Sequence, residues 1–270
     1  MPTADPAHVV CYPQPGKARS REVLEAFAAG ARAAGARADL CTTPPDRPGP
    51  GGAAFYGCVG LERLLAQARA SSNDWWYGDN AFFDRSRGRY FRFAHNAFQS
   101  DHGSRLTDHG VEARSRLAAL GVALAPWHRG GRHVVVVEQS AHFLGLCGAG
   151  ADWLDRTLGE IRRGTDRPLR VRAWRRDKDK AAATLAHDLA GAWALVTHTS
   201  AAANEALLAG VPVFVTGPCA ATPLAGGPLS ALEQPRYPDH REDWAAGLAA
   251  SQWTLDELRA GMAWRALQDG

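Results

Sequence analysis

The residues of this 270-residue chain that are best placed to do chemistry lie in the range Trp193–Val215, WALVTHTSAAANEALLAGVPVFV. An apolar run, the turn THTS, an alanine-rich segment closed by Gly210 and a second apolar run predict a strand, a turn, a helix and a strand. Ser200 is expected at the N-cap of that helix, and the small Ala201 and Ala202 would let a ligand approach the first backbone N–H groups. Because those groups and the positive end of the helix dipole attract anions, this unit is predicted to hold a phosphate.

Two more side chains of the same unit are candidates for ligand binding. His198 lies in the predicted turn, and Glu205 lies in the predicted helix, where its carboxylate could accept hydrogen bonds from ribose hydroxyls. Parallel α/β sheets bind ligands at the carboxyl ends of their strands, which is where this turn is expected. The alternative is that Ser200 only caps a structural helix.

A basic segment precedes this unit, VRAWRRDKDK in Val171–Lys180. Arg175 and Lys178 are its candidate phosphate ligands, because guanidinium and ammonium groups both pair with phosphate oxygens. Neighbouring parallel strands bring their carboxyl ends to one edge, so this segment would face the same ligand as Ser200. A charge run of this kind is also compatible with a solvated surface.

An aromatic segment, DWWYGDNAFFDRSRGRYFRFAHNAFQ in Asp74–Gln99, has the densest set of polar and aromatic residues. Period-two alternation in its second half would place Arg92 and Asn96 on one strand face and Phe91 on the other. Aromatic residues mixed with Arg and Asn suit a sugar or an unstacked base. The alternative is an amphipathic hairpin whose aromatic side chains fill the core. The candidate ligand-binding residues of this segment are Asn80, Arg89, Tyr90, Arg92 and Asn96.

The elements that must position these residues alternate between strands and helices along the chain. Buried-strand patterns such as HVVVV, bounded by helical segments, predict an α/β fold with parallel sheets in two Rossmann-like lobes. We expect an N-terminal lobe at 1–127 and a C-terminal lobe at 128–270 that includes the terminal helices. Thr254 is expected to cap the last of these. The glycines of Leu144–Gly150 lack the G-x-G-x-x-G spacing, which argues against a dinucleotide site.

The amino-acid composition indicates the broad class of protein. The chain is 46% hydrophobic and 22% charged with a formal net charge of +3, which is typical of a globular protein. Its five cysteines are spread out without a C-x-x-C pair, so they indicate reduced thiols and neither a disulfide framework nor a zinc site. No secretory leader or long apolar run is visible, so a cytoplasmic protein without a membrane partner is expected. No metal requirement is expected either, since no His or carboxylate pair has ligand spacing.

The Trp193–Val215 unit resembles the donor-binding domain of GT-B-type glycosyltransferases and of non-hydrolysing epimerases. The resemblance covers Ser200, Ala201, Ala202 and Glu205, and it implies that the serine and the small residues hold the diphosphate of a nucleotide sugar while the glutamate holds the ribose. The Val171–Lys180 segment resembles the basic strand end that such enzymes, including capsule-polysaccharide transferases, place opposite the same phosphates. The implied co-substrate is a nucleotide-diphosphate sugar, with no separate cofactor and no bound metal.

Glycosyl transfer with inversion requires a group that takes the proton of the acceptor hydroxyl. Asp79 is the first candidate for this catalytic base, and His95 is the second. Both lie in the aromatic segment, which therefore becomes the candidate acceptor side of the enzyme.

The whole chain also resembles short glycosyltransferase-like proteins of bacteriophage genomes, through DWWYGDNAFF, GRYFRFAHNAFQ and SQWTLDELRAGMAWRAL. That resemblance implies an acceptor in duplex DNA, a hydroxymethylated pyrimidine, and the basic turn DRSRGR would suit DNA contact. A polysaccharide or small-molecule acceptor, an epimerase, and a binding module for a nucleotide sugar or nucleic acid without catalysis remain alternatives.

Overall fold

The computed structural model describes residues 7–99, 110–174 and 184–268. It divides into two compact units, Met1–Ser100 with Ala249–Gly270, and Asp101–Leu248. This division by contacts differs from the predicted lobes 1–127 and 128–270 at two places. The segment after residue 101, with α3 (Gly110–Ala119), belongs to the second unit, and the last helices belong to the first.

The sheet of the first unit has five strands in the order β2-β1-β3-β4-β5. The first four strands are parallel, and β5 pairs antiparallel with β4 as a hairpin. The strands are β1 (His8–Tyr12), β2 (Arg37–Leu40), β3 (Gly52–Tyr56), β4 (Trp75–Asn80) and β5 (Phe91–His95). The parallel strands confirm the predicted α/β class, with an antiparallel strand added at one edge.

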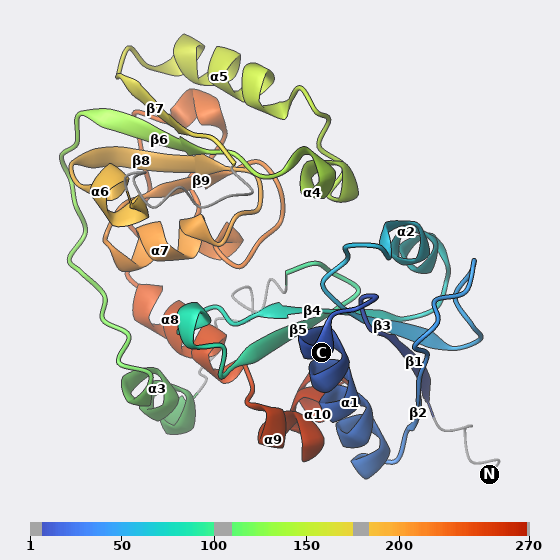
Figure 1. Ribbon diagram of the computed structural model, residues 1–270. Coiled ribbons are helices and arrows are strands. Elements are labelled where there is room, and N and C mark those ends of the chain that lie inside the picture. The colour runs from blue at the N-terminus through green and yellow to red at the C-terminus, as the bar shows by residue number, and fades with distance from the viewer. Residues whose placement is uncertain (1–6, 100–109, 175–183, 269–270) are drawn as a thin grey trace. The chain divides into compact units, whose positions relative to one another are not determined.

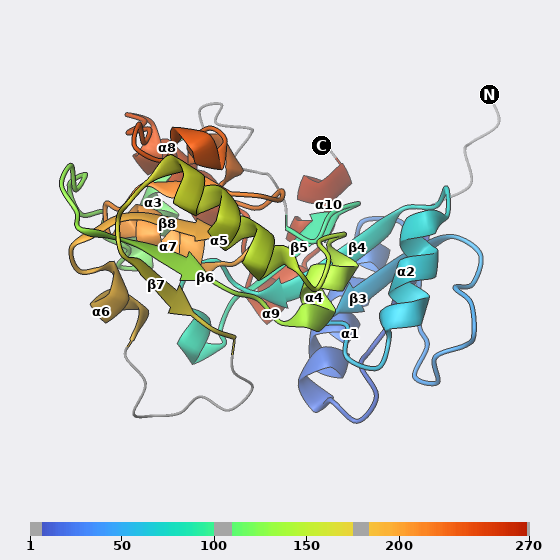
Figure 2. The same ribbon diagram turned by 90° about the horizontal axis from the view of Figure 1, so that it is seen from above.

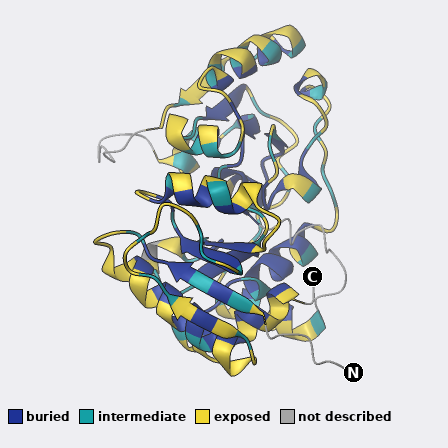
Figure 3. Ribbon diagram, turned by 90° about the vertical axis from the view of Figure 1, so that its right-hand side faces the viewer, coloured by how far each residue is buried: buried dark blue, intermediate teal, exposed yellow. Residues whose placement is uncertain are grey.

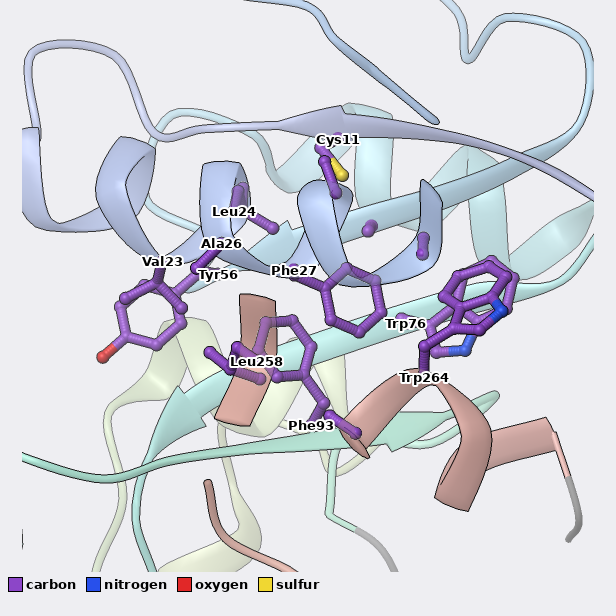
Figure 4. Close-up of a cluster of buried hydrophobic side chains, with 14 of the residues drawn as sticks. Cys11, Val23, Leu24, Ala26, Phe27, Tyr56, Trp76, Phe93, Leu258 and Trp264 are labelled. Atoms are coloured by element: carbon purple, nitrogen blue, oxygen red, sulfur yellow. The ribbon is translucent and has the colours of Figure 1, made fainter. Parts of the chain in front are cut away.

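Helices cover both faces of this sheet. Figure 1 shows α1 (Ala18–Ala33), α9 (Leu255–Arg259) and α10 (Met262–Gln268) on one face and α2 (Glu62–Ala70) on the other. Under α1, the ring of Phe27 stacks on Phe93 with centroids 4.2 Å apart and meets the edge of Trp264 (Figure 4). The short η1 (Arg85–Arg87) lies in the β4–β5 connection.

The docking of α9 on α1 explains a glycine in the middle of a long helix. A Cβ at Gly30 would overlap the backbone carbonyl of Leu258, so only glycine permits this approach of the two backbones. Thr254 caps α9 as predicted, with a capping box formed with Glu257. The terminal helices thus complete the core of the first unit.

The second unit has a four-stranded, fully parallel sheet in the order β7-β6-β8-β9. Its strands are β6 (His133–Val137), β7 (Leu169–Arg172), β8 (Ala192–Thr197) and β9 (Val213–Val215). Its helices are α3, α4 (Ala141–Leu146), α5 (Trp153–Gly164), α6 (Leu185–Leu189), α7 (Ala202–Leu208) and most of α8 (Arg241–Ala250), with 3₁₀ turns η3 (Thr222–Leu224) and η4 (Leu229–Ala231). The glycine-rich stretch Leu144–Gly150 begins inside α4.

Figures 1 and 2 show α5 over one face of this sheet, and Figure 1 shows α7 on the other. The core between α5 and the sheet includes Trp153, Ile161, Val134 and Val196. Buried positions follow the strands of both sheets, whereas the outward surfaces of the helices are exposed (Figure 3). Within the described residues, no helix has the length and apolar content that crossing a bilayer requires.

Candidate functional site

The polar residues that follow β6, β8 and β9 lie at one edge of the second sheet, because parallel strands end on the same side. We call this set the carboxyl-edge cluster; its members are Gln139, His198, Thr199, Ser200 and Thr216. His198 and Ser200 were predicted from the sequence. Gln139, Thr199 and Thr216 were not, although each follows its strand end by no more than two residues.

A side-chain amide connects the first two strand ends of the cluster. Oε1 of Gln139 accepts the backbone N–H of Thr199 over 2.8 Å, and Nε2 of Gln139 lies 3.0 Å from the Thr199 hydroxyl oxygen, to which it donates. Because the partners are 60 residues apart in the chain, these bonds fix the loop after β8 against the loop after β6. The turn that carries Ser200 is thereby held in one conformation.

The imidazole of His198 connects the second and third strand ends. Its Nδ1 lies 2.9 Å from the hydroxyl oxygen of Thr216, which also accepts the indole N–H of Trp153 over 2.8 Å. Burial lowers the pKa of His198 below its ordinary value; the charge of Arg156 acts in the same direction, and the backbone carbonyl of Cys147 opposes it. The ring is therefore neutral at physiological pH.

Two buried polar atoms of this region have no hydrogen-bond partner among the described residues, Nε2 of His198 and Nδ2 of Asn204. Their residues are 6% and 2% exposed, so solvent does not satisfy them. An unsatisfied buried donor costs about 1–3 kcal/mol. Such groups in a native protein call for a partner from outside the chain, for example a bound ion.

The start of α7 differs from the sequence-based expectation by one residue. The N-cap position is Ala201, and the helix begins at Ala202. The Ser200 hydroxyl nevertheless accepts the backbone N–H of Ala202 over 3.2 Å, so it performs the local capping that was considered as the alternative. One of the N–H groups expected to be open to a phosphate is therefore already bonded.

Glu205 lies apart from the carboxyl-edge cluster. Its side chain is exposed and lines a hollow of about 410 Å³ together with Ala186, Leu189 and Gly191. None of the cluster residues lines this hollow. The structure therefore does not bring His198 and Ser200 to the hollow that the side chain of Glu205 lines. The other two predicted donor ligands, Arg175 and Lys178, lie outside the described residues.

The aromatic segment forms the β4–β5 hairpin, and its aromatic side chains are core residues. Trp75, Trp76, Tyr77, Phe82, Phe83, Phe91 and Phe93 are all buried. The alternation predicted for its second half is confirmed: Phe91 and Phe93 face the core under α1, and Arg92 points to the other face. The hairpin whose aromatics fill the core is therefore the correct alternative, and these rings are not available for stacking on a sugar or a base.

Asp79 is held in an ion pair. Its Oδ2 accepts a hydrogen bond from the buried guanidinium of Arg92 over 2.9 Å, and its Oδ1 accepts the backbone N–H of Asn80 over 2.7 Å. Arg92 also donates to the carbonyl of Phe98. Asp79 and Arg92 face each other across the strand pair, so this contact is part of the sheet.

His95 lies at the other end of the same hairpin. It pairs in register with Trp76, whereas Arg92 pairs with Asp79, three residues further along β4. Three residues of a strand span about 10 Å, and odd spacing places side chains on opposite faces. The two candidate bases, Asp79 and His95, therefore cannot serve one acceptor hydroxyl together.

His95 has partners of its own. Its Nε2 lies 2.9 Å from a carboxylate oxygen of Asp74, and its ring stacks on Trp76 with centroids 5.1 Å apart. Hydrogen bonds from Asn96 and His95 outweigh the effect of burial and hold the pKa of Asp74 below its ordinary value. Asn96 has a φ of 52° and accepts the backbone N–H of Trp75, so it serves as a turn residue.

The other predicted acceptor residues have structural partners. Asn80 accepts a hydrogen bond from Tyr56, whose pKa burial raises to about 12. Arg89 pairs with Asp84 over 2.6 Å, which offsets part of the positive charge of the DRSRGR turn. Tyr90 is half-buried beside it.

A second hollow lies in the first unit, at the carboxyl end of β1, and no sequence motif indicated it. It measures about 440 Å³, and its lining includes Gly16 and Lys17 before α1, Arg21 and Glu25 on α1, and Thr42 after β2. Within the described residues, no group of three His, Cys, Asp or Glu side chains has the geometry of a metal site.

Parallel sheets in two Rossmann-like units define the class of fold, α/β of the GT-B type, as predicted. Two solved structures are similar to this chain, both of KpsC from Thermosulfurimonas dismutans. The β-Kdo 2,7 transferase has a TM-score of 0.53 at 12% identity, over 96% of this chain and 99% of that chain. The β-Kdo 2,4 transferase has a TM-score of 0.49 at 13% identity, over 88% and 89%. No protein-family model matches the sequence, and no curated protein matches it.

Proposed function

We propose that this protein is a glycosyltransferase that binds a nucleotide-diphosphate sugar at the carboxyl-edge cluster. The observation that carries the proposal is an ordered set of polar side chains, together with two buried nitrogens, Nε2 of His198 in the cluster and Nδ2 of Asn204 in α7, that have no hydrogen-bond partner among the described residues. A diphosphate supplies oxygen acceptors, and the carboxyl edge of a parallel sheet is where α/β proteins bind such ligands. The similarity to a KpsC transferase supports the fold for this role.

Transfer at this cluster would rest on positioning and on stabilisation of the leaving diphosphate. His198 and Ser200 would contact the phosphates, and Ala201 and Ala202 stay predicted neighbours of the same ligand. Arg175 and Lys178 stay predicted ligands of the same phosphates. Glu205 stays the predicted ribose partner. Its side chain lines the hollow beside Leu189 and Gly191, so the nucleoside would have to extend along α7 to reach it.

The acceptor that we propose first is a hydroxyl of a carbohydrate, in line with the activity given for the similar KpsC β-Kdo 2,7 transferase. Hydroxymethylated duplex DNA stays the second proposal, carried by the exposed Arg85 and Arg87 of the DRSRGR turn. Asp79 and His95 stay alternative bases. Asp79 would have to give up its pairing with Arg92, whereas His95 already has the carboxylate partner that orients a basic imidazole.

The test is incubation of the protein with a panel of nucleotide-diphosphate sugars, alone, with oligosaccharides, and with hydroxymethylated duplex DNA. Mass spectrometry then detects sugar added to each acceptor, and the release of nucleoside diphosphate is measured in parallel. Release that depends on one acceptor supports transfer and identifies the acceptor class. A change in the sugar nucleotide without acceptor indicates an epimerase, and binding without turnover indicates a binding module. Activity lost with EDTA and restored by a divalent ion would contradict the metal-free mechanism.

A further inference from the structure

The ring of His198 is held by a chain of hydrogen bonds that starts at Trp153. The Trp153 indole N–H donates to the hydroxyl oxygen of Thr216, and that oxygen lies 2.9 Å from Nδ1 of His198. An indole nitrogen can only donate, so the Thr216 oxygen acts as acceptor toward Trp153 and keeps its own proton to donate. Among the described residues, Nδ1 of His198 lies in position to receive that proton.

The surroundings of the ring favour one of its two neutral forms. A neutral imidazole carries one proton, and Nδ1 cannot hold it while accepting from Thr216. The backbone carbonyl of Cys147 raises the pKa of the ring and does not select between its two nitrogens. The contact with Thr216 therefore places the proton of the neutral ring on Nε2.

Nε2 of His198 is then a buried N–H group without a hydrogen bond to the described residues. The ring cannot tilt freely to find a partner, because Gly217 lies so close that an added Cβ would overlap it. His198 directly follows β8 and precedes Ser200 by two residues, at the edge where the ligand is proposed to bind. A fixed, unsatisfied donor at this place fits an oxygen acceptor that arrives with the ligand.

We propose that Trp153 and Thr216 are positioning residues that fix the proton of His198 on Nε2, so that His198 donates a hydrogen bond to a phosphate oxygen of the ligand. The inference rests on the proposed function, since the ligand is the diphosphate of that same cluster. The inference adds a requirement on the histidine: its neutral ring must accept a hydrogen bond at Nδ1 and present a free N–H at Nε2. Neither positioning residue needs to touch the ligand.

The first experiment determines the ring proton by NMR of the full-length protein labelled with ¹⁵N and ¹³C in histidine, with His198 assigned from a His198→Gln spectrum. His133 and His128 are internal references, because each donates to a backbone carbonyl, from Nε2 and from Nδ1 respectively. We expect the ring shifts of His198 to match those of His133. Thr216→Val should produce a mixture of both forms, and Thr216→Ser should restore the first. Shifts like those of His128 in the wild-type protein would overturn the proposal.

The second experiment measures the affinity for inorganic pyrophosphate by calorimetry in His198→Gln and His198→Asn. The glutamine amide can place an N–H near the position of Nε2, whereas the asparagine amide reaches only the position of Nδ1. We expect His198→Asn and Thr216→Val to weaken binding about tenfold, as for one lost hydrogen bond to a charged group, with Thr216→Ser and His198→Gln close to wild type.

The possible outcomes distinguish the ligand role of His198 from the proposed donor site as a whole. Equal affinity of wild-type protein, His198→Asn and His198→Gln would overturn the ligand role of His198 and leave the proposed donor site standing. No pyrophosphate binding by the wild-type protein would contradict the donor site itself, and the ligand role of His198 with it. Thr216 is exposed, so its variants are expected to fold. They therefore test the proposal even if the histidine variants do not fold.

Discussion

The β4–β5 hairpin and the carboxyl-edge cluster contain similar kinds of residues, yet the structure uses them in opposite ways. In the hairpin, the aromatic rings are buried and Asp79 has its carboxylate occupied by Arg92 and Asn80. In the cluster, the side chains are ordered by one another, and Nε2 of His198 has no hydrogen-bond partner among the described residues. The hairpin also contains such an atom, Nε1 of Trp76, but that indole packs in the apolar core beside Phe27 and Trp264. A dense set of reactive residue types therefore does not define a site; an unsatisfied donor within a set of ordered polar side chains is the better indication.

The largest change in stability is expected from Phe93→Ala, which tests whether the hairpin is a core element. Phe93 is fully buried and stacks on Phe27, so truncation should lower the free energy of unfolding by about 3–5 kcal/mol. Urea denaturation followed by circular dichroism measures this loss. The control is Tyr90→Ala, at a half-buried residue of the same segment. A loss below about 1 kcal/mol would show that the hairpin is not the core element described here.

Asp79→Asn distinguishes a structural from a catalytic carboxylate. It removes the charged partner of the buried Arg92, and a hydrogen bond between charged groups is worth about 1.5–3 kcal/mol. Because Asp79 is partly exposed, we expect a loss near the lower end of that range in urea denaturation. Asp74→Asn, at an exposed carboxylate, should cost less. Unchanged stability together with abolished glycosyl transfer would instead make Asp79 the catalytic base.

A smaller effect is expected from the lowered pKa of His198. Between the ordinary histidine pKa of about 6.5 and its lower value in the folded protein, the unfolded chain binds a proton that the folded chain does not. Stability therefore falls as the pH is lowered through this window. His198→Gln removes this contribution, so its urea midpoint should decline less than that of the wild type between pH 7.5 and 5.5.

Other groups do not obscure that comparison. Asp74 and Glu233 have lowered pKa values, and their contributions are lost only on acidification below the ordinary carboxylate range, about pH 4. Parallel pH profiles of wild-type and His198→Gln protein would mean that the ring is not held neutral by burial.

Local sequence patterns were sufficient to predict most elements. The apolar runs at His8–Tyr12 and His133–Val137, the helical periodicity of α1 and the cap at Thr254 are all properties of neighbouring residues. The position of the terminal helices was not predictable in this way. It depends on the close approach of Gly30 and Leu258, which are distant in the sequence.

The candidate site was predictable only in part, for the same reason. His198 and Ser200 follow a recognisable buried strand, so their edge position was predicted. Their partners Gln139 and Thr216 come from other strand ends, and nothing local distinguishes them. In the aromatic segment, composition alone could not separate a ligand-binding surface from a core hairpin, because both require rings beside polar groups.

The central claim is that the carboxyl-edge cluster binds the diphosphate of a nucleotide sugar. Its most direct test is a calorimetric titration of nucleoside diphosphate into wild-type protein, Ser200→Ala and Thr184→Ala. Thr184 is the control, because its hydroxyl accepts a backbone N–H at the start of α6, three residues on, and that of Ser200 accepts one at the start of α7, two residues on. We expect Ser200→Ala to weaken binding about tenfold and Thr184→Ala to leave it unchanged. Equal affinity in all three proteins would contradict the claim.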